Sequence, residues 1–160
     1  SPSIENVTIR DNYAMMGGGL YCRYSSHPVI ENVLIDSNYC TDFGAGVYCG
    51  DSSNPSFENV TIRDNTANEK GGALYCAASS NPSVKNSVIT GNISEDYGGG
   101  IYTNTFSHPD LANVEISCNL AEDYGGGILC NNSGLSLTNV TITDNLAQLG
   151  GGIYYWDNGT

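Results

Sequence analysis

The sequence predicts an all-β protein: a parallel β-helix of six coils, each of about 25–27 residues with three short strands. Three features predict this fold: an asparagine pair, a glycine cluster and a run of alternating apolar residues, which recur together six times. Successive first asparagines lie 26, 27, 27, 27 and 26 residues apart, and the second asparagines follow six residues later. These are Asn6, Asn32, Asn59, Asn86, Asn113 and Asn139, then Asn12, Asn38, Asn65, Asn92, Asn119 and Asn145.

Each repeat begins with a turn and continues into two strand-like runs on either side of the first asparagine. Proline occupies the turn in five repeats and suits a corner, while Gly134-Leu135 replaces it in the sixth. Both runs alternate apolar with mostly polar residues, which favours strands over helix. The apolar columns contain Ile4, Ile30, Phe57, Val84, Leu111 and Leu137; Val7, Val33, Val60, Ser87, Val114 and Val140; and Ile9, Ile35, Ile62, Ile89, Ile116 and Ile142.

A third strand follows the glycine cluster. We expect its first residue to face inward, its second outward and its third inward again. The inward positions are Leu20, Val47, Leu74, Ile101, Ile128 and Ile153, then Cys22, Cys49, Cys76, Thr103, Cys130 and Tyr155. The outward column is Tyr21, Tyr48, Tyr75, Tyr102, Leu129 and Tyr154.

Length and charge limit the classes of function. The repeats run through residues 1–160, so we expect a single domain without recognisable caps. The 17 acidic and 5 basic residues give a net charge of -12, which disfavours binding to nucleic acid or to an anionic membrane surface. No apolar run reaches the roughly 18 residues of a membrane span, and no signal segment is recognisable at Ser1.

Two motifs carry a family resemblance. The pairing of G-G-A-L at residues 71–74 with I-x-x-N at residues 62–65 resembles the repeats of polymorphic outer-membrane proteins, although Ile stands where that family usually has Phe. It is also similar to the wider group of extracellular right-handed β-helix proteins, including pectate-lyase-like folds. The resemblance implies a right-handed parallel β-helix at a cell surface, often with an adhesive or structural role.

The two asparagine columns are interpreted as structural ladders, because side-chain amides stacked on successive coils can hydrogen-bond along the axis. Glycosylation sequons that begin within the ladders are therefore poor glycan sites. We expect Asn131 and Asn158, which lie in predicted loops, to be better candidates.

The six cysteines leave two interpretations open. Cys22, Cys49 and Cys76 share one inward column, where at most one disulfide fits, or all three are small buried hydrophobic residues. Cys40 stacks between Ala14 and Ala67. A cysteine-based metal site is disfavoured because no C-x-x-C pair occurs.

The loop before each glycine cluster carries acidic residues in register. Glu95, Asp96, Glu122 and Asp123 form the densest group, and stacked like charges repel unless cations bind them. Calcium binding and a solvated acidic edge both remain open here.

The outward tyrosines Tyr21, Tyr48, Tyr75, Tyr102 and Tyr154 could contact carbohydrate or another protein, or could pack on one another. Phe43, Tyr97 and Tyr124 form a second aromatic row beside them.

Catalysis is disfavoured because the chain offers few bases and no loop long enough to wall a cleft. Arg10, Asp36 and Arg63 instead form an expected surface salt ladder. The sequence therefore favours a non-catalytic structural solenoid without a cofactor, extracellular or on the cell surface. A carbohydrate-binding module that uses the tyrosines and, less favoured, a polysaccharide lyase are the alternatives. Because the first and last repeats are as apolar as the inner ones, we expect further stacking at both ends, with separate copies or with more repeats.

Overall fold

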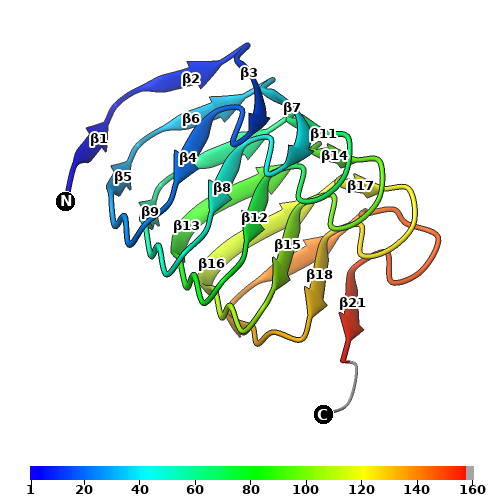
Figure 1. Ribbon diagram of the computed structural model, residues 1–160. Helices are drawn as coiled ribbons and strands as arrows, with labels where there is room; N and C mark the ends of the chain where they lie inside the picture. Colours follow the sequence, from blue (N-terminus) through cyan, green and yellow to red (C-terminus); the bar gives the residue numbers. More distant parts are fainter. Residues whose placement is uncertain (158–160) are drawn as a thin grey trace.

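The computed structural model describes residues 1–157, which form six coils stacked along one axis. Figure 1 shows the coils progressing from the first one (blue) to the last one (red), which lie at opposite ends of the stack. Every strand pairing is parallel and joins residues about one repeat apart, as in Ile4 with Ile30. The predicted all-β fold of stacked coils is confirmed.

The largest sheet, called sheet A here, contains the runs on both sides of the first asparagine. Its strands are β1 (Ser3–Glu5), β5 (Val29–Glu31), β9 (Ser56–Glu58), β13 (Ser83–Thr90), β16 (Asp110–Ser117), β19 (Ser136–Thr138), β2 (Thr8–Arg10), β6 (Leu34–Asp36), β10 (Thr61–Arg63) and β20 (Thr141–Thr143). In β13 and β16 the two runs are continuous. Two of the three predicted strands of each coil thus share one sheet.

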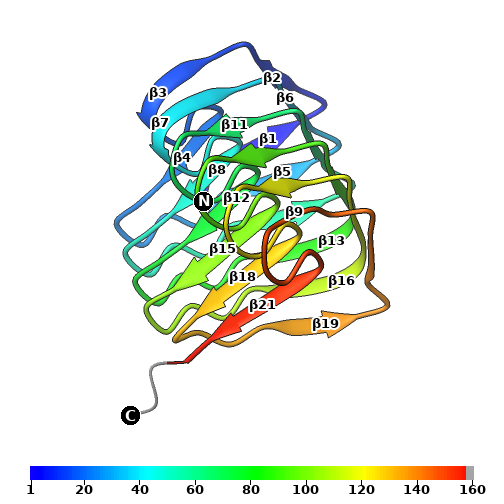
Figure 2. The ribbon, with the colours of Figure 1, turned by 90° about the vertical axis from the view of Figure 1, so that its right-hand side faces the viewer.

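Two further sheets complete each coil, and Figure 2 shows them from a second direction. Sheet B follows the second asparagine and was not singled out from the sequence. Its strands are β3 (Tyr13–Met16), β7 (Tyr39–Phe43), β11 (Thr66–Ala67), β14 (Ile93–Ser94) and β17 (Leu120–Ala121). Sheet C follows the glycines, with β4 (Leu20–Cys22), β8 (Val47–Cys49), β12 (Leu74–Cys76), β15 (Ile101–Asn104), β18 (Ile128–Asn131) and β21 (Ile153–Trp156).

The bends between strands depend on residues in the left-handed backbone region. The first asparagine of every pair has this conformation, with φ between 48° and 56°, and Asn tolerates it better than most residues. The first glycine of each cluster has it too, and at Gly71 (φ 69°) a Cβ would lie 2.9 Å from the Cβ of Tyr75. Glycine is required at this close approach, which brings the loop onto sheet C.

The interior is filled by the predicted apolar columns. Phe57, Ile62, Leu74 and Cys76 are all buried in one continuous cluster with their counterparts from the other coils. Cys40 is buried between Ala14 and Ala67, with which it pairs in register. The inward and outward faces assigned by alternation are therefore correct.

The two end coils expose part of the same columns. Val7 of the first coil is 39% exposed, whereas its counterpart Val33 is 3% exposed. Leu137 and Ile153 of the last coil are 37% and 41% exposed. Both end faces of the described stack therefore present apolar side chains that internal coils bury.

Candidate functional site

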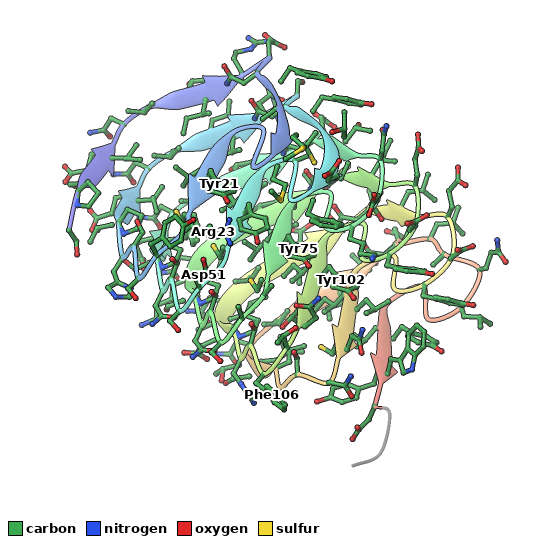
Figure 3. The ribbon with its side chains drawn as sticks, in the orientation of Figure 1. Tyr21, Arg23, Asp51, Tyr75, Tyr102 and Phe106 are labelled. Carbon is green, nitrogen blue, oxygen red and sulfur yellow. The ribbon has the colours of Figure 1, made fainter. Side chains whose placement is uncertain are left out.

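The tyrosine column on sheet C forms a continuous stack, part of which is labelled in Figure 3. The ring centroids of Tyr21 and Tyr48 are 4.9 Å apart, and those of Tyr48, Tyr75 and Tyr102 follow at 5.3 Å intervals. Their planes differ by 6° to 13°, so the rings lie nearly parallel. The register of the third strand places one ring on each of the first four coils, because its strands pair without a shift.

The outward tyrosines are largely covered, which favours the alternative that they pack on one another over the alternative of a contact surface. Tyr75 and Tyr102 point away from the interior but are only 6% and 3% exposed, and Leu129 is fully buried. The aromatic residues of the preceding loops lie over them, with Phe43 stacked 4.9 Å from Tyr75. Of the predicted contact residues, Tyr21 at the first coil remains exposed.

This aromatic layer is a second core outside the coil interior. Burial raises the pKa of the Tyr75 hydroxyl above its usual range, although its hydroxyl accepts a hydrogen bond from Nδ2 of Asn104 at 3.2 Å. Tyr124 stacks on Tyr154 at 5.0 Å and packs edge-on against Trp156 at 6.3 Å. The stacked rings stabilise the fold by packing on one another rather than by remaining available to a ligand.

Lys70 interrupts the row of loop aromatics. It pairs in register between Phe43 and Tyr97, and its Nζ lies 5.4 Å and 5.5 Å from the centroids of their rings. The lysine cation therefore occupies the place of a ring and contacts the neighbouring rings by cation–π interaction.

The second asparagine column is a buried amide ladder. In each of the first five coils, the backbone N–H and Nδ2 both donate to Oδ1 of the asparagine in the next coil, as from Asn65 to Asn92 at 3.1 Å and 2.9 Å. Nδ2 also donates to the isoleucine carbonyl of the preceding coil, as from Asn65 to Ile35 at 3.1 Å. Because the same bonds recur from Asn12 to Asn145, the structural role expected for this column is supported along the stack.

The first asparagine column is different, since its members are mostly exposed. Their side chains make fewer hydrogen bonds between coils, such as Nδ2 of Asn59 to Oδ1 of Asn32 at 3.4 Å and Nδ2 of Asn113 to Oδ1 of Asn86 at 2.9 Å. Their main contribution is the left-handed backbone that turns the chain.

Of the two alternatives for the acidic residues, the structure favours the solvated edge over the calcium site. Glu95 and Glu122 are exposed, while Asp96 and Asp123 are half-buried. Across residues 1–157, no three Asp, Glu, His or Cys side chains come together as metal ligands. Asp123 instead accepts a hydrogen bond from Gln148 at 3.3 Å. In this structure the column forms a solvated acidic edge.

The cysteines are free thiols, and five of them are buried. Cys22, Cys49 and Cys76 stack in register inside the coil, which agrees with the interpretation as small buried hydrophobic residues. Burial raises the pKa of Cys40 and of Cys130 to about 12. Cys118 is the exposed one and occupies a left-handed corner with φ 55°.

The loop position expected for the candidate glycan site at Asn131 is wrong. It was expected in a loop but lies at the end of β18, half-buried, and its Nδ2 donates to the hydroxyl of Tyr102 at 3.2 Å. An N-linked glycan would be attached to this same nitrogen, which the fold uses for the hydrogen bond to Tyr102. Asn158 lies outside the described residues.

A serine ladder at the corner after sheet C was missed. The backbone N–H of Ser26 donates to Oγ of Ser53, Ser53 to Ser80, and Ser80 to Ser107, at 3.1 Å to 3.2 Å. The equal spacing of these serines in the sequence could have shown it. The ladder stops at the turn after sheet C in the fifth coil, which is one residue shorter than the others. Among the described residues, Oγ of Ser133 in this turn has no hydrogen-bond partner.

At the shortened turn the surface is hollowed. A groove of about 670 Å³ lies there, lined by Phe106, His108 and Tyr155 together with side-chain amides and hydroxyls. Phe106 is 70% exposed and lies on a left-handed turn with φ 60°. Sequence reasoning missed this groove because it arises from a single missing residue.

The charged column of sheet A forms the expected salt ladder. Asp36, whose side chain is 6% exposed, lies 3.3 Å from Nε of Arg63 and 3.9 Å from Nε of Arg10. Arg23 makes a separate pair with Asp51, also labelled in Figure 3, and hydrogen bonding to that carboxylate raises the pKa of the guanidinium. These polar side chains hold neighbouring coils together.

Comparison with known proteins gives a family but no individual relative. No curated protein and no solved structure matches the chain. Within residues 1–157, the structure has no helix long and apolar enough to cross a membrane. The full length, residues 1–160, matches the family described as the right handed beta helix region. Its stacked parallel coils agree with that match, and the chain belongs to the right-handed β-helix family.

Proposed function

We propose that the chain is a non-catalytic structural solenoid whose end faces are covered by another coil. The additional coil comes either from a second copy, which would build a filament, or from further repeats of the same polypeptide. The observation that carries the proposal is the exposure of core columns at both ends, at Val7 in the first coil and at Leu137 and Ile153 in the last one.

The direction of the amide ladder supports head-to-tail stacking. Each asparagine donates toward the last coil, so the first coil presents Oδ1 of Asn12 and the last coil presents the backbone N–H of Asn145. These groups are complementary. Stacked in register, Asn145 of one copy would donate to Asn12 of the next, which repeats the geometry found between every pair of internal coils.

The absence of catalysis belongs to the same proposal. It is supported by the use of asparagine, serine and arginine side chains in bonds between coils rather than in a convergent cluster. An extracellular or cell-surface location, and a closer relation to the polymorphic outer-membrane or pectate-lyase-like repeats, rest on the resemblance of the G-G-A-L and I-x-x-N motifs. Protease treatment of intact cells that express the tagged protein would test the location.

Sedimentation velocity across micromolar concentrations tests the stacking of copies. We expect species larger than a monomer for the unmodified chain. Val7→Lys places a charge on the end face and should shift the chain to monomer, whereas Thr8→Lys, on an outward position of the same coil, should leave association unchanged. A concentration-independent monomer for the unmodified chain would refute stacking in trans.

A second candidate, carbohydrate binding, is favoured by one observation. The corner groove places the exposed ring of Phe106 beside polar side chains, and such a ring can stack on a sugar. A glycan array with the unmodified chain and with Phe106→Ala tests it, and binding that the substitution leaves unchanged would exclude this groove. An assay for unsaturated products from acidic polysaccharides tests the third alternative, a lyase.

A further inference from the structure

The outward column of sheet B is an apolar row that runs along the stack. Its members pair in register from coil to coil, so each lies directly over the next. They are Tyr13, Tyr39, Thr66, Ile93, Leu120 and Leu146. Ile93 is 37% exposed and Leu146 is 65% exposed. Ile93, Leu120 and Leu146 are called the apolar stripe below.

The other outward columns differ from this one. In sheet A, the column that starts at Ser3 and the column of Glu5 and Glu31 consist mainly of polar residues. In sheet C, the outward aromatic residues are covered by the preceding loops. Within residues 1–157 no loop covers the apolar stripe, because the residues that follow its strands, Glu95 and Glu122, are themselves exposed. A contiguous exposed apolar row of this kind marks an interaction surface.

The charge beside the apolar stripe identifies the chemistry of the partner. Glu95 follows Ile93 by two residues, and Glu122 follows Leu120 by two, so both lie beside the stripe on the outer side. All five Lys and Arg residues lie within residues 1–85. Residues 86–160 carry eight acidic residues and no Lys or Arg. This half of the stack therefore attracts cations and repels anionic partners.

The stripe also contains a hollow. A groove of about 410 Å³ lies between the fifth and sixth coils, and Leu120, Leu146 and Ala147 form its apolar walls. Glu122 and Gln148 lie at its polar side. Such a groove can take an apolar side chain while the neighbouring carboxylate contacts a base.

We propose that the apolar stripe is a docking surface for a cationic amphipathic helix of a partner protein. Coils repeat every ~4.8 Å and helix turns every ~5.4 Å, so a helix laid along the stack can place about one apolar side chain on each coil. Its Lys or Arg residues then face Glu95 and Glu122. A second copy of this chain is disfavoured as the occupant, since it would place its own acidic residues against Glu95 and Glu122.

Fluorescence anisotropy with a labelled amphipathic Leu/Lys helical peptide tests the proposal. We expect saturable binding that weakens by at least about tenfold in Ile93→Thr/Leu120→Thr. Threonine is accepted in this column, since Thr66 occupies it in the third coil. Val88→Thr is the matched control, because Val88 is half-buried on the outer side of sheet A between Thr61 and Glu115.

Charge variants test the second part of the site. Glu95→Gln/Glu122→Gln should weaken binding by about tenfold and reduce its dependence on salt, whereas Asp110→Asn/Glu115→Gln, with the same change in net charge on sheet A, should not. A peptide with Leu and Glu in the same pattern should not bind.

Three results would overturn the docking surface. The first is no binding of the Leu/Lys peptide, and the second is equal loss of binding in the stripe variants and in the Val88→Thr control. The third is sideways dimerisation of the chain that Ile93→Thr/Leu120→Thr abolishes, which would assign the stripe to a second copy. Because the stripe lies on the side of the stack, Val7→Lys should leave peptide binding unchanged, and the outcome is independent of end-to-end stacking.

Discussion

Truncation of one amide in the buried ladder should destabilise the fold much more than loss of an exposed one. Asn65→Ala removes a side chain whose Oδ1 accepts from the backbone N–H and from Nδ2 of Asn38, both at 2.9 Å. After truncation the buried N–H of Asn38 has lost its partner, which costs about 1–3 kcal/mol, and each other lost bond adds about 0.5–1.5 kcal/mol. The other lost bonds are those from Nδ2 of Asn38 and from Nδ2 of Asn65 itself, so we expect a total loss of at least about 3 kcal/mol.

The control is Asn59→Gly in the exposed column. It removes an amide that makes only a 3.4 Å contact to Asn32, and glycine keeps the φ of 53° without strain, so the loss should stay below about 1 kcal/mol. Urea unfolding followed by circular dichroism measures both changes, provided that the slopes with urea are equal. Similar losses for the two variants would refute the assignment of the second column as the stabilising ladder.

Three further predictions follow from the two cores. Ile62→Ala should cost about 2–5 kcal/mol by leaving a cavity in the interior, while Thr61→Ala, on the outer side, should cost much less. Equal losses in urea unfolding would mean that the assignment of the strand faces is wrong. Lys70→Tyr should raise the melting temperature by completing the ring stack between Phe43 and Tyr97, and an unchanged or lower value would show that the cation–π contacts are worth at least as much. The pKa of the Cys40 thiol is about 9 in the unfolded chain, and burial raises it to about 12 in the fold. The stability that the buried, protonated thiol contributes is therefore fully present below pH 9 and is lost as the pH rises toward 12. Cys40→Ala, which matches Ala67 in the same column, should therefore reduce the loss of stability between pH 8 and pH 10.5, and an unchanged loss would contradict the assignment.

The interior could be predicted from the sequence because alternation and a fixed period determine which residues share a column. Ile62, Leu74 and Cys76 are buried as expected, since a shift of one residue would have turned every apolar residue outward. The structural role of the asparagines was also predictable, because a site that repeats in every coil suits a ladder better than a single active site.

The aromatic layer could not be predicted in the same way. Alternation correctly places Tyr75 and Tyr102 outside the coil, but whether an outward ring is exposed depends on the loop that folds over it. The path of that loop depends on Gly71 and its counterparts, whose left-handed conformation and missing side chain allow close contact with the tyrosine backbone. The two aromatic rows visible in the sequence are one packed layer rather than two binding surfaces.

The strands of sheet B were missed for a different reason. In β11, β14 and β17 they are two residues long, too short to show alternation, so their outward residues could not be recognised as a row. The expected loop position of Asn131 was wrong because the third strand extends by one residue in β18, where the side chain bonds to Tyr102.

Cryo-electron microscopy of the purified chain at micromolar concentration tests the central claim most directly. The account predicts rods longer than six coils, one coil in width, in which the spacing of ~4.8 Å continues across each junction between copies. Asn145 of one copy should lie within hydrogen-bonding distance of Asn12 in the next. Separate particles of one chain, or copies joined side by side with their end faces open, would contradict stacking between copies.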